Sequence, residues 1–182
     1  LSKFGDESLS IITIFHMIEH LEYSNLLRLL RECFRVLRED GIIIMETPSI
    51  DNLLVSSKVF YTDPTHITHI NPDGLSFALD NLGFNSVKHF YIHGGPLQDA
   101  DPLKTTRILN GIAQDVLFIA TKSNSTSQLI FQDNKDWSSD LDCALTTLEA
   151  AIEFDLNIQN LSQDFNNFNS VINNKIQENL SN

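Results

Sequence analysis

The stretch that decides the fold reads Leu9-Ser10-Ile11-Ile12-Thr13-Ile14-Phe15. Five of these seven residues are apolar, and three are the β-branched residue isoleucine. This composition predicts a strand that is buried on both faces. A second apolar run, Ile42-Ile43-Ile44-Met45, predicts a second strand of the same kind.

The segment between these two strands has the pattern of an amphipathic helix. Apolar residues recur at helical spacing from Leu26 to Leu37, and the other side of the helix carries Arg28, Arg31, Glu32, Arg35 and Arg38. Asp40-Gly41 is expected to end the helix, because glycine readily adopts the left-handed conformation of a helix C-terminus. Strand, helix and strand form a βαβ unit, in which the two strands are parallel neighbours with a right-handed crossover.

The next part of the chain completes an α/β domain. A loop is predicted over residues 62–70, followed by a helix that begins near Pro72 and is capped by Gly83. The runs Phe84–Ile92 and Ala113–Thr121 predict two more strands, which can pair antiparallel beside the parallel strands. The domain therefore spans residues 1–122.

The C-terminal third of the chain has a different composition. Residues 123–136 are rich in Ser, Asn, Thr and Gln, and we interpret them as a linker. From Trp137 to the end, residues 137–182, apolar residues recur at spacings of three and four, which predicts a helix of about 40 residues and about 60 Å. It either folds into a helical hairpin on the domain or, as we favour, forms a coiled coil that makes a homo-oligomer or leads to a further module.

Charge and cysteine content exclude several classes of function. A formal net charge of −12 and a pI near 4.7 argue against nucleic acid as a partner. Cys33 and Cys143 lie far apart in helical patterns, so we expect reduced thiols and a cytoplasmic protein. We find neither a signal peptide nor an apolar run of the roughly 20 residues that span a membrane. The first residue is Leu, and we expect the chain to be a fragment.

Polar residues follow the first strand and lie in the loop after the second. His16, Glu19 and His20 come directly after residue 15, and the loop carries Asp63 and His66. Ligands of parallel sheets bind at the carboxyl ends of the strands, so both segments are expected at the ligand edge. We predict no metal site, because His16 and His20 lack a third ligand at suitable spacing.

Three motifs resemble class I S-adenosylmethionine-dependent methyltransferases. They are Phe15-His16-Met17-Ile18-Glu19-His20-Leu21, Arg35-Val36-Leu37-Arg38-Glu39-Asp40-Gly41 and Phe60-Tyr61-Thr62-Asp63-Pro64-Thr65-His66. The third is similar to a bacterial subgroup that modifies surface polysaccharides and often carries a coiled coil. The resemblance covers residues 8–122 and implies the C-terminal half of a Rossmann-like sheet, with the family's strands in the order 4-5-7-6.

The resemblance also implies roles for individual residues. These are Phe15 and His16 as cofactor contacts, His20 and Tyr61 as acceptor contacts, and Glu19, Asp63 and His66 as catalytic residues. His66 would act as a base or bind an anionic acceptor, since neutral imidazole titrates near working pH. The alternative is structural: Glu19 and His20 cap the following helix, while Asp63 and His66 lock the loop through turn hydrogen bonds.

The sequence departs from the family at the cofactor pocket. None of its seven glycines is spaced as Gly-x-Gly, and we find no acidic residue that would hold the ribose. The strand at residues 9–15 would therefore lie at an exposed edge of the sheet. Two functions fit: methyl transfer to an oxygen of a glycan or small acceptor by the complete protein, or a non-catalytic interaction module derived from this fold.

The incomplete pocket predicts that the 182-residue chain alone does not bind S-adenosylmethionine measurably. Titration calorimetry of the purified chain with the cofactor checks this. A micromolar dissociation constant would contradict the prediction.

Overall fold

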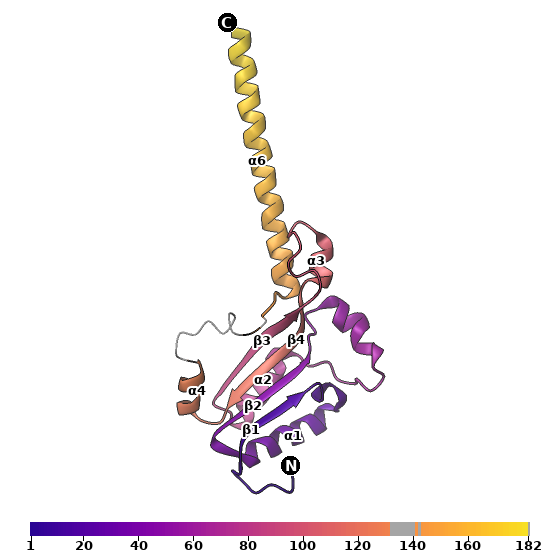
Figure 1. Ribbon diagram of the computed structural model, residues 1–182, viewed down its shortest axis with the longest axis vertical. Helices are drawn as coiled ribbons and strands as arrows, with labels where there is room; N and C mark the ends of the chain where they lie inside the picture. The colour runs from indigo at the N-terminus through magenta and orange to yellow at the C-terminus, as the bar shows by residue number, and fades with distance from the viewer. Residues whose placement is uncertain (132–140, 142, 182) are drawn as a thin grey trace.

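A four-stranded mixed sheet forms the centre of the domain in the computed structural model, which describes residues 1–131, 141 and 143–181 (Figure 1). The strands are β1 (Leu9–Phe15), β2 (Leu37–Pro48), β3 (Ser86–Gly94) and β4 (Ala113–Thr121). Their order is β1-β2-β4-β3, with β1 and β2 parallel and β4 antiparallel to both β2 and β3. The predicted α/β class, the parallel pair and the antiparallel last pair are confirmed.

Helical segments connect and flank these strands. They are η1 (Ile18–His20), α1 (Tyr23–Val36), η2 (Val55–Val59), η3 (Phe60–Thr62), α2 (Pro72–Leu82), α3 (Thr105–Asn110), α4 (Asn124–Phe131) and α6 (Thr147–Ser181). Helix α2 begins and ends as predicted. The Asn71 side chain accepts a hydrogen bond from the Gly74 amide at 2.9 Å, and Gly83 ends the helix with a φ of 105°.

The main core lies between one face of the sheet and helices α1 and α2. Leu30 and Cys33 of α1, Leu79 of α2 and Phe118 of β4 are all fully buried there. Burying one such Leu or Phe side chain contributes about 1.5–3 kcal/mol, so this layer holds the βαβ unit together.

Strand β1 is buried on one face only, and the prediction of burial on both faces was wrong. Ile12 and Ile14 face the core, whereas Ile11 is 57% exposed and Phe15 is 54% exposed. Successive strand residues point to opposite faces, and only the face toward α1 is covered here. β1 is the outermost strand of the described sheet, as the sequence predicted.

The junction between α1 and β2 differs from the prediction. The helix ends at Val36, and Leu37 is already extended and pairs with Leu9. The partner of β1 then moves from Leu37 to Ile42, so residues 38–41 form an irregularity in the ladder. Gly41 is needed for space rather than as a left-handed cap, because a Cβ there would lie 2.8 Å from the Arg38 carbonyl oxygen.

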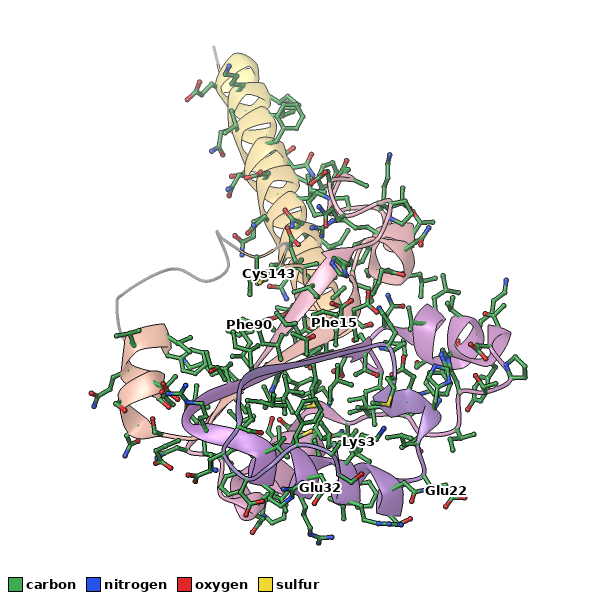
Figure 2. The ribbon with its side chains drawn as sticks, turned by 60° about the horizontal axis from the view of Figure 1, so that its bottom comes forward. Lys3, Phe15, Glu22, Glu32, Phe90 and Cys143 are labelled. Atoms are coloured by element: carbon green, nitrogen blue, oxygen red, sulfur yellow. The ribbon has the colours of Figure 1, made fainter. Side chains whose placement is uncertain are left out.

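The segment after β4 also differs from the prediction. Residues 124–131 of the expected linker form helix α4, and Trp137 lies outside the described residues. The described C-terminal helix begins at Thr147, because the residues before it pair with the sheet. The Ala144 amide donates to the Tyr91 carbonyl at 2.9 Å, and the Ala113 amide donates to the Leu145 carbonyl at 2.8 Å. Cys143 and Phe90 pack against a second, small core, which is formed by Ile92, Leu117 and Ile119 of the sheet (Figure 2).

Helix α6 is one continuous helix of 35 residues that extends away from the domain, not a hairpin (Figure 1). Ala150 is buried at its base, and Arg107 Nη1 lies 2.7 Å from Glu153 Oε2. Farther along, its apolar side chains are exposed: Leu156, Ile158, Leu161, Phe165, Phe168, Val171, Ile172 and Ile176. Among the described helices, we find none long and apolar enough to cross a membrane.

The buried position of Cys33 predicts a thiol that is inert in the folded protein. Burial raises the pKa of Cys33 to about 12, so the reactive thiolate is scarce at neutral pH. Thiol titration should label Cys33 only after denaturation, as mapped by peptide mass spectrometry. Labelling of Cys33 at the same rate in native and denatured protein would contradict this.

Candidate functional site

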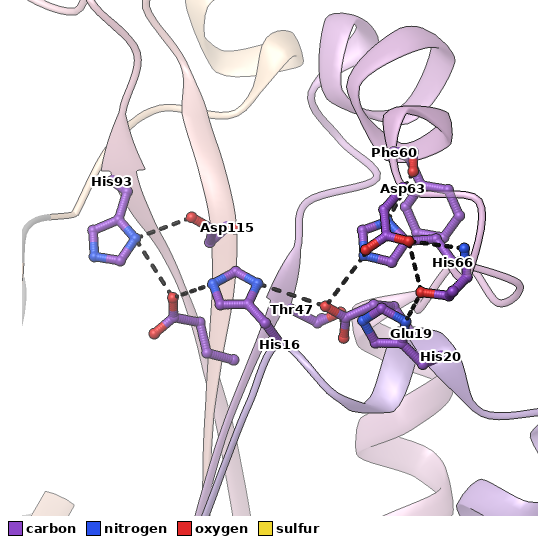
Figure 3. Close-up of polar contacts among 11 residues, drawn as sticks. His16, Glu19, His20, Thr47, Phe60, Asp63, His66, His93 and Asp115 are labelled. Carbon is purple, nitrogen blue, oxygen red and sulfur yellow. Dashed lines mark hydrogen bonds and ion pairs between the residues drawn. The ribbon is translucent and has the colours of Figure 1, made fainter.

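Polar side chains from all four strands meet at one edge of the sheet (Figure 3). His16 directly follows β1, while Glu46 and His93 lie near the carboxyl ends of β2 and β3. Asp115 lies near the start of β4, which runs in the opposite direction and so begins at this edge. This is the edge where ligands of α/β sheets bind.

His16, Glu46, His93 and Asp115 form one half of this edge. Nε2 of His16 lies 3.0 Å from Glu46 Oε1, and Nδ1 of His93 lies 3.0 Å from Asp115 Oδ2 and 3.7 Å from Glu46 Oε1. Both histidines have left-handed backbones, with φ of 47° at His16 and 55° at His93. Such conformations cost about 1–3 kcal/mol and cluster at functional sites.

Glu19 is the centre of the other half, and its side chain is fully buried. Oε2 accepts a hydrogen bond from Thr47 Oγ1 at 3.1 Å, but Oε1 accepts none. His16 Nδ1 lies 3.5 Å from Oε1, and His66 Nε2 lies 4.0 Å from it. Because burying an unpaired carboxylate is costly, this oxygen requires a hydrogen-bond donor or a positive charge beside it.

The loop that carries His66 is clamped to η1 by main-chain hydrogen bonds. The Glu19 carbonyl accepts from the amides of Ile67 and Thr68, each at 3.0 Å. Thr68 Oγ1 donates to the Leu21 carbonyl at 2.6 Å. These bonds hold residues 63–68 over the carboxylate of Glu19.

Asp63 is held as a carboxylate by its own loop. The Thr65 hydroxyl donates to Asp63 Oδ1 at 2.6 Å, and the Thr65 amide donates to the same oxygen at 2.8 Å. These bonds, the hydroxyl first, hold the pKa of Asp63 below its usual value. A negative charge therefore stays beside His66, whose Nε2 lies 3.9 Å from Asp63 Oδ2.

The tautomer of His66 follows from its neighbours. Nδ1 lies 2.8 Å from the Phe60 carbonyl oxygen, which only accepts hydrogen bonds, so Nδ1 carries a proton. In the neutral ring, Nε2 then presents a lone pair toward Glu19 and Asp63. The His66 side chain is only 14% exposed, so this arrangement is well shielded from water.

The structure brings five of the seven predicted site residues together, namely His16, Glu19, His20, Asp63 and His66. The other two, Phe15 and Tyr61, are exposed to solvent. Phe15 is 54% exposed, and Tyr61 is 64% exposed, with its hydroxyl 3.1 Å from His69 Nε2. The hydrogen bonds of Asp63 fit the predicted loop-locking role as well as a catalytic one.

Four residues of the edge were missed by the sequence-based predictions: Glu46, Thr47, His93 and Asp115. Glu46, Thr47 and His93 had a usable signal, since each is a polar residue at the end of an apolar strand. Asp115 had none, because only the direction of β4 brings it to this edge.

From the sequence we predicted no metal site, because His16 and His20 lacked a third ligand at suitable spacing. The fold brings His66 to Glu19 and His20, and one ligand atom from each lies within 4.8 Å of the other two. His16, Glu46 and Asp115 form a second such group.

The glycines of the chain do not form a cradle for a nucleotide. Gly94 and Gly95 lie nearest the ligand edge, at the end of β3. A Cβ at Gly94 would lie 1.4 Å from the Gln98 side chain, and one at Gly95 would lie 2.3 Å from the Asn110 carbonyl oxygen. Both glycines thus pack against their own chain.

Comparisons with known proteins agree with the fold. Residues 1–45 match the family model described as a methyltransferase domain. Proteins from two Mycobacterium tuberculosis strains, CDC 1551 / Oshkosh and ATCC 25618 / H37Rv, are each named a probable S-adenosylmethionine-dependent methyltransferase. They are 35% identical over 99 residues, which is 53% of this chain and 34% of the relative. The chain thus spans about a third of the length of these relatives.

Two solved structures have similar folds. A SAM-dependent methyltransferase from Archaeoglobus fulgidus is 30% identical, with a TM-score of 0.57 over 66% of this chain and 62% of that one. A putative methyltransferase from Haloferax volcanii, solved with the Trm112 methyltransferase activator, is 11% identical with a TM-score of 0.51 over 66% of this chain and 57% of that one, and shows the fold alone. The chain is therefore similar in sequence and fold to part of S-adenosylmethionine-dependent methyltransferases, and the match to the family model covers residues 1–45.

Proposed function

We propose that this chain is the C-terminal half of an enzyme that transfers a methyl group from S-adenosylmethionine to an oxygen of a glycan or a similar small acceptor. The observation that carries the proposal is the shielded pair of His66 and Glu19 at the ligand edge. When bound, the cofactor would supply the methyl group on a positively charged sulfur. The protein's task is then to align the acceptor and to remove its proton.

His66 is the base in this proposal. Its Nδ1 donates a hydrogen bond to the Phe60 carbonyl. Nε2 is therefore the atom that takes the proton from the hydroxyl group to be methylated. Glu19 and Asp63 then stabilise the imidazolium, because their carboxylate oxygens lie 4.0 Å and 3.9 Å from Nε2. Two carboxylates beside one imidazole also favour a neutral, hydroxyl-bearing acceptor over an anionic one.

The other predicted residues have supporting roles in the proposal. Phe15 and His16 stand at the end of β1, where they would line the cofactor side of the site. His20 and Tyr61 would contact the acceptor, His20 from η1 and Tyr61 from the exposed segment η3. The surface-polysaccharide character of the acceptor rests only on the motif from Phe60 to His66.

A second candidate function is assembly through α6, favoured by the row of exposed apolar side chains along this helix. The exposed part of α6, from Leu156 onward, would form a coiled coil with a second copy of the chain, which is a shorter segment than the 137–182 predicted from the sequence. Large exposed apolar stripes mark interaction surfaces in proteins. Without catalysis, this assembly would be the main role of the chain.

Replacing His66 by Ala should lower kcat about 100-fold or more, because the acceptor proton loses its base. The measurement is release of S-adenosylhomocysteine by the full-length protein with a hydroxyl-bearing glycan acceptor. His69→Ala is the matched control, since it removes a ring from the same loop but not from the pair with Glu19, and it should stay within about threefold. A His66→Ala protein with wild-type kcat would refute the role of His66.

Charges on the apolar stripe of α6 should dissociate the oligomer, because a buried charge is costly. Sedimentation equilibrium of the Phe165→Glu, Phe168→Glu double variant should give the 20.6 kDa mass of one chain, against a multiple for the wild type. The Asn166→Glu, Asn167→Glu variant adds the same charges beside the stripe and should keep the wild-type mass. If a protein truncated before Trp137 still sediments with the same number of chains per particle as the wild type, the coiled coil is excluded.

A further inference from the structure

We propose that Glu19, His20 and His66 bind a divalent transition-metal ion of the zinc type. The three residues come from η1 and from the loop after η3, and their ligand atoms lie within 4.8 Å of one another (Figure 3). The inference concerns a binding site, and ion binding requires neither the cofactor nor an acceptor.

The buried oxygen of Glu19 is the first reason. The side chain is fully buried, and Oε1 accepts no hydrogen bond although it points toward the histidines. Two imidazole nitrogens lie near it, His16 Nδ1 at 3.5 Å and His66 Nε2 at 4.0 Å, and both distances are at or beyond the limit of an ordinary hydrogen bond. A metal ion bound between these groups would place a compensating positive charge beside the buried carboxylate.

The tautomers of the two histidines are the second reason. Nδ1 of His66 donates to the Phe60 carbonyl at 2.8 Å. The Thr65 hydroxyl donates its hydrogen bond to Asp63, so its oxygen accepts the hydrogen bond that Nδ1 of His20 donates at 2.8 Å. Both rings therefore have protonated Nδ1 atoms that are anchored to oxygen, and in the neutral form of each ring Nε2 is the atom free to bind a metal ion. This is the outer-shell arrangement that orients metal-binding histidines.

The spacing of the ligand atoms is the third reason. Zinc binds histidine nitrogen and carboxylate oxygen at about 2.0–2.2 Å, which puts neighbouring ligand atoms of a tetrahedron about 3.3–3.6 Å apart. The 4.0 Å between Glu19 Oε1 and His66 Nε2, and the limit of 4.8 Å within which all three ligand atoms lie, are longer than this, so side-chain rotation must bring the ligands closer when the ion binds. The carboxylate of Asp63, 3.9 Å from the same nitrogen, adds negative charge at the rim.

The donor set selects the class of ion. Imidazole suits zinc, iron, copper and nickel, whereas magnesium prefers oxygen ligands. Two histidines and one carboxylate leave a coordination position open, as in catalytic zinc sites. A water or hydroxyl group in that position loses its proton more easily than in bulk solvent.

The site shares His66 with the proposed function and deepens it in one respect. An ion on Nε2 occupies the lone pair that would accept the acceptor proton, so ion and proton compete for His66. In the ion-loaded protein, activation of the acceptor hydroxyl would pass from the imidazole to the ion. This consequence alone rests on the proposed function.

The test is zinc binding to the full 182-residue chain. Chelator-treated protein is titrated with zinc chloride by calorimetry at pH 7.5, with magnesium chloride as the second probe. We expect one zinc per chain and binding of magnesium at least about 100-fold weaker. Glu19→Gln, His20→Ala and His66→Ala should each weaken zinc binding about tenfold or more.

Two control variants locate the ion. His69→Ala removes a histidine of the same loop that lies on Phe60 and Tyr61, and it should bind zinc within about twofold of the wild type. Glu46→Gln removes a ligand of the second group and should also stay within about twofold. Circular dichroism of each variant without metal checks folding. If His66→Ala does not fold, zinc binding by Glu19→Gln tests the site instead.

The proposal is overturned if the chain takes up no stoichiometric zinc, or if Glu19→Gln and His20→Ala bind it as tightly as the wild type. Loss of binding in Glu46→Gln with full binding in Glu19→Gln would also overturn it, since the ion would then lie on the other group. Zinc binding without methyl transfer by the full-length protein would count against the proposed function only. Methyl transfer without zinc binding would count against the metal site only.

Discussion

A buried carboxylate is the constraint on which the rest of the ligand edge depends. Glu19 lies beneath the loop at 63–68 with no exposed surface, and its main-chain carbonyl holds that loop through the amides of Ile67 and Thr68. An isolated carboxylate in such a place would cost several kcal/mol, so its surroundings must supply hydrogen bonds or positive charge. Thr47 from β2 satisfies one oxygen, and His66 Nε2 lies 4.0 Å from the other. Burial of a single side chain thereby ties together η1, a neighbouring strand and a distant loop.

Strand direction explains why histidines and carboxylates gather at this edge. β1, β2 and β3 end at this edge, and β4 begins there, so residues that flank four different apolar runs become neighbours. Glu46 and Asp115 reach the same histidine, His93, from antiparallel strands. Histidines alternate with carboxylates along the edge, so each negative charge has a group beside it that can carry a proton or share an ion. The negative net charge of the whole chain is a separate property and does not describe this local balance.

Sequence patterns located most of the secondary structure, and they failed where tertiary pairing replaced local preference. The helical periodicity continues to Leu37, yet this residue leaves the helix to pair with Leu9 and fill the core. The same happens before α6, where Ala144 and Leu145 have helical spacing but bond to the backbone of the sheet. Apolar runs alone likewise did not distinguish an edge strand covered on one face from a central strand, which is why Ile11 was expected to be buried.

The sequence by itself determined the α/β class, the parallel βαβ unit, the capped helix α2 and the presence of polar residues after two strands. These features depend on short-range periodicity, capping and turn chemistry, which a local stretch carries entirely. Only the tertiary structure decided that His66 lies over Glu19, that Asp115 shares an edge with His16, and that α6 starts at Thr147. Those outcomes depend on the direction of β4, on hydrogen bonds between distant segments and on the cost of burying a charge, and none of these is encoded in the spacing of neighbouring residues.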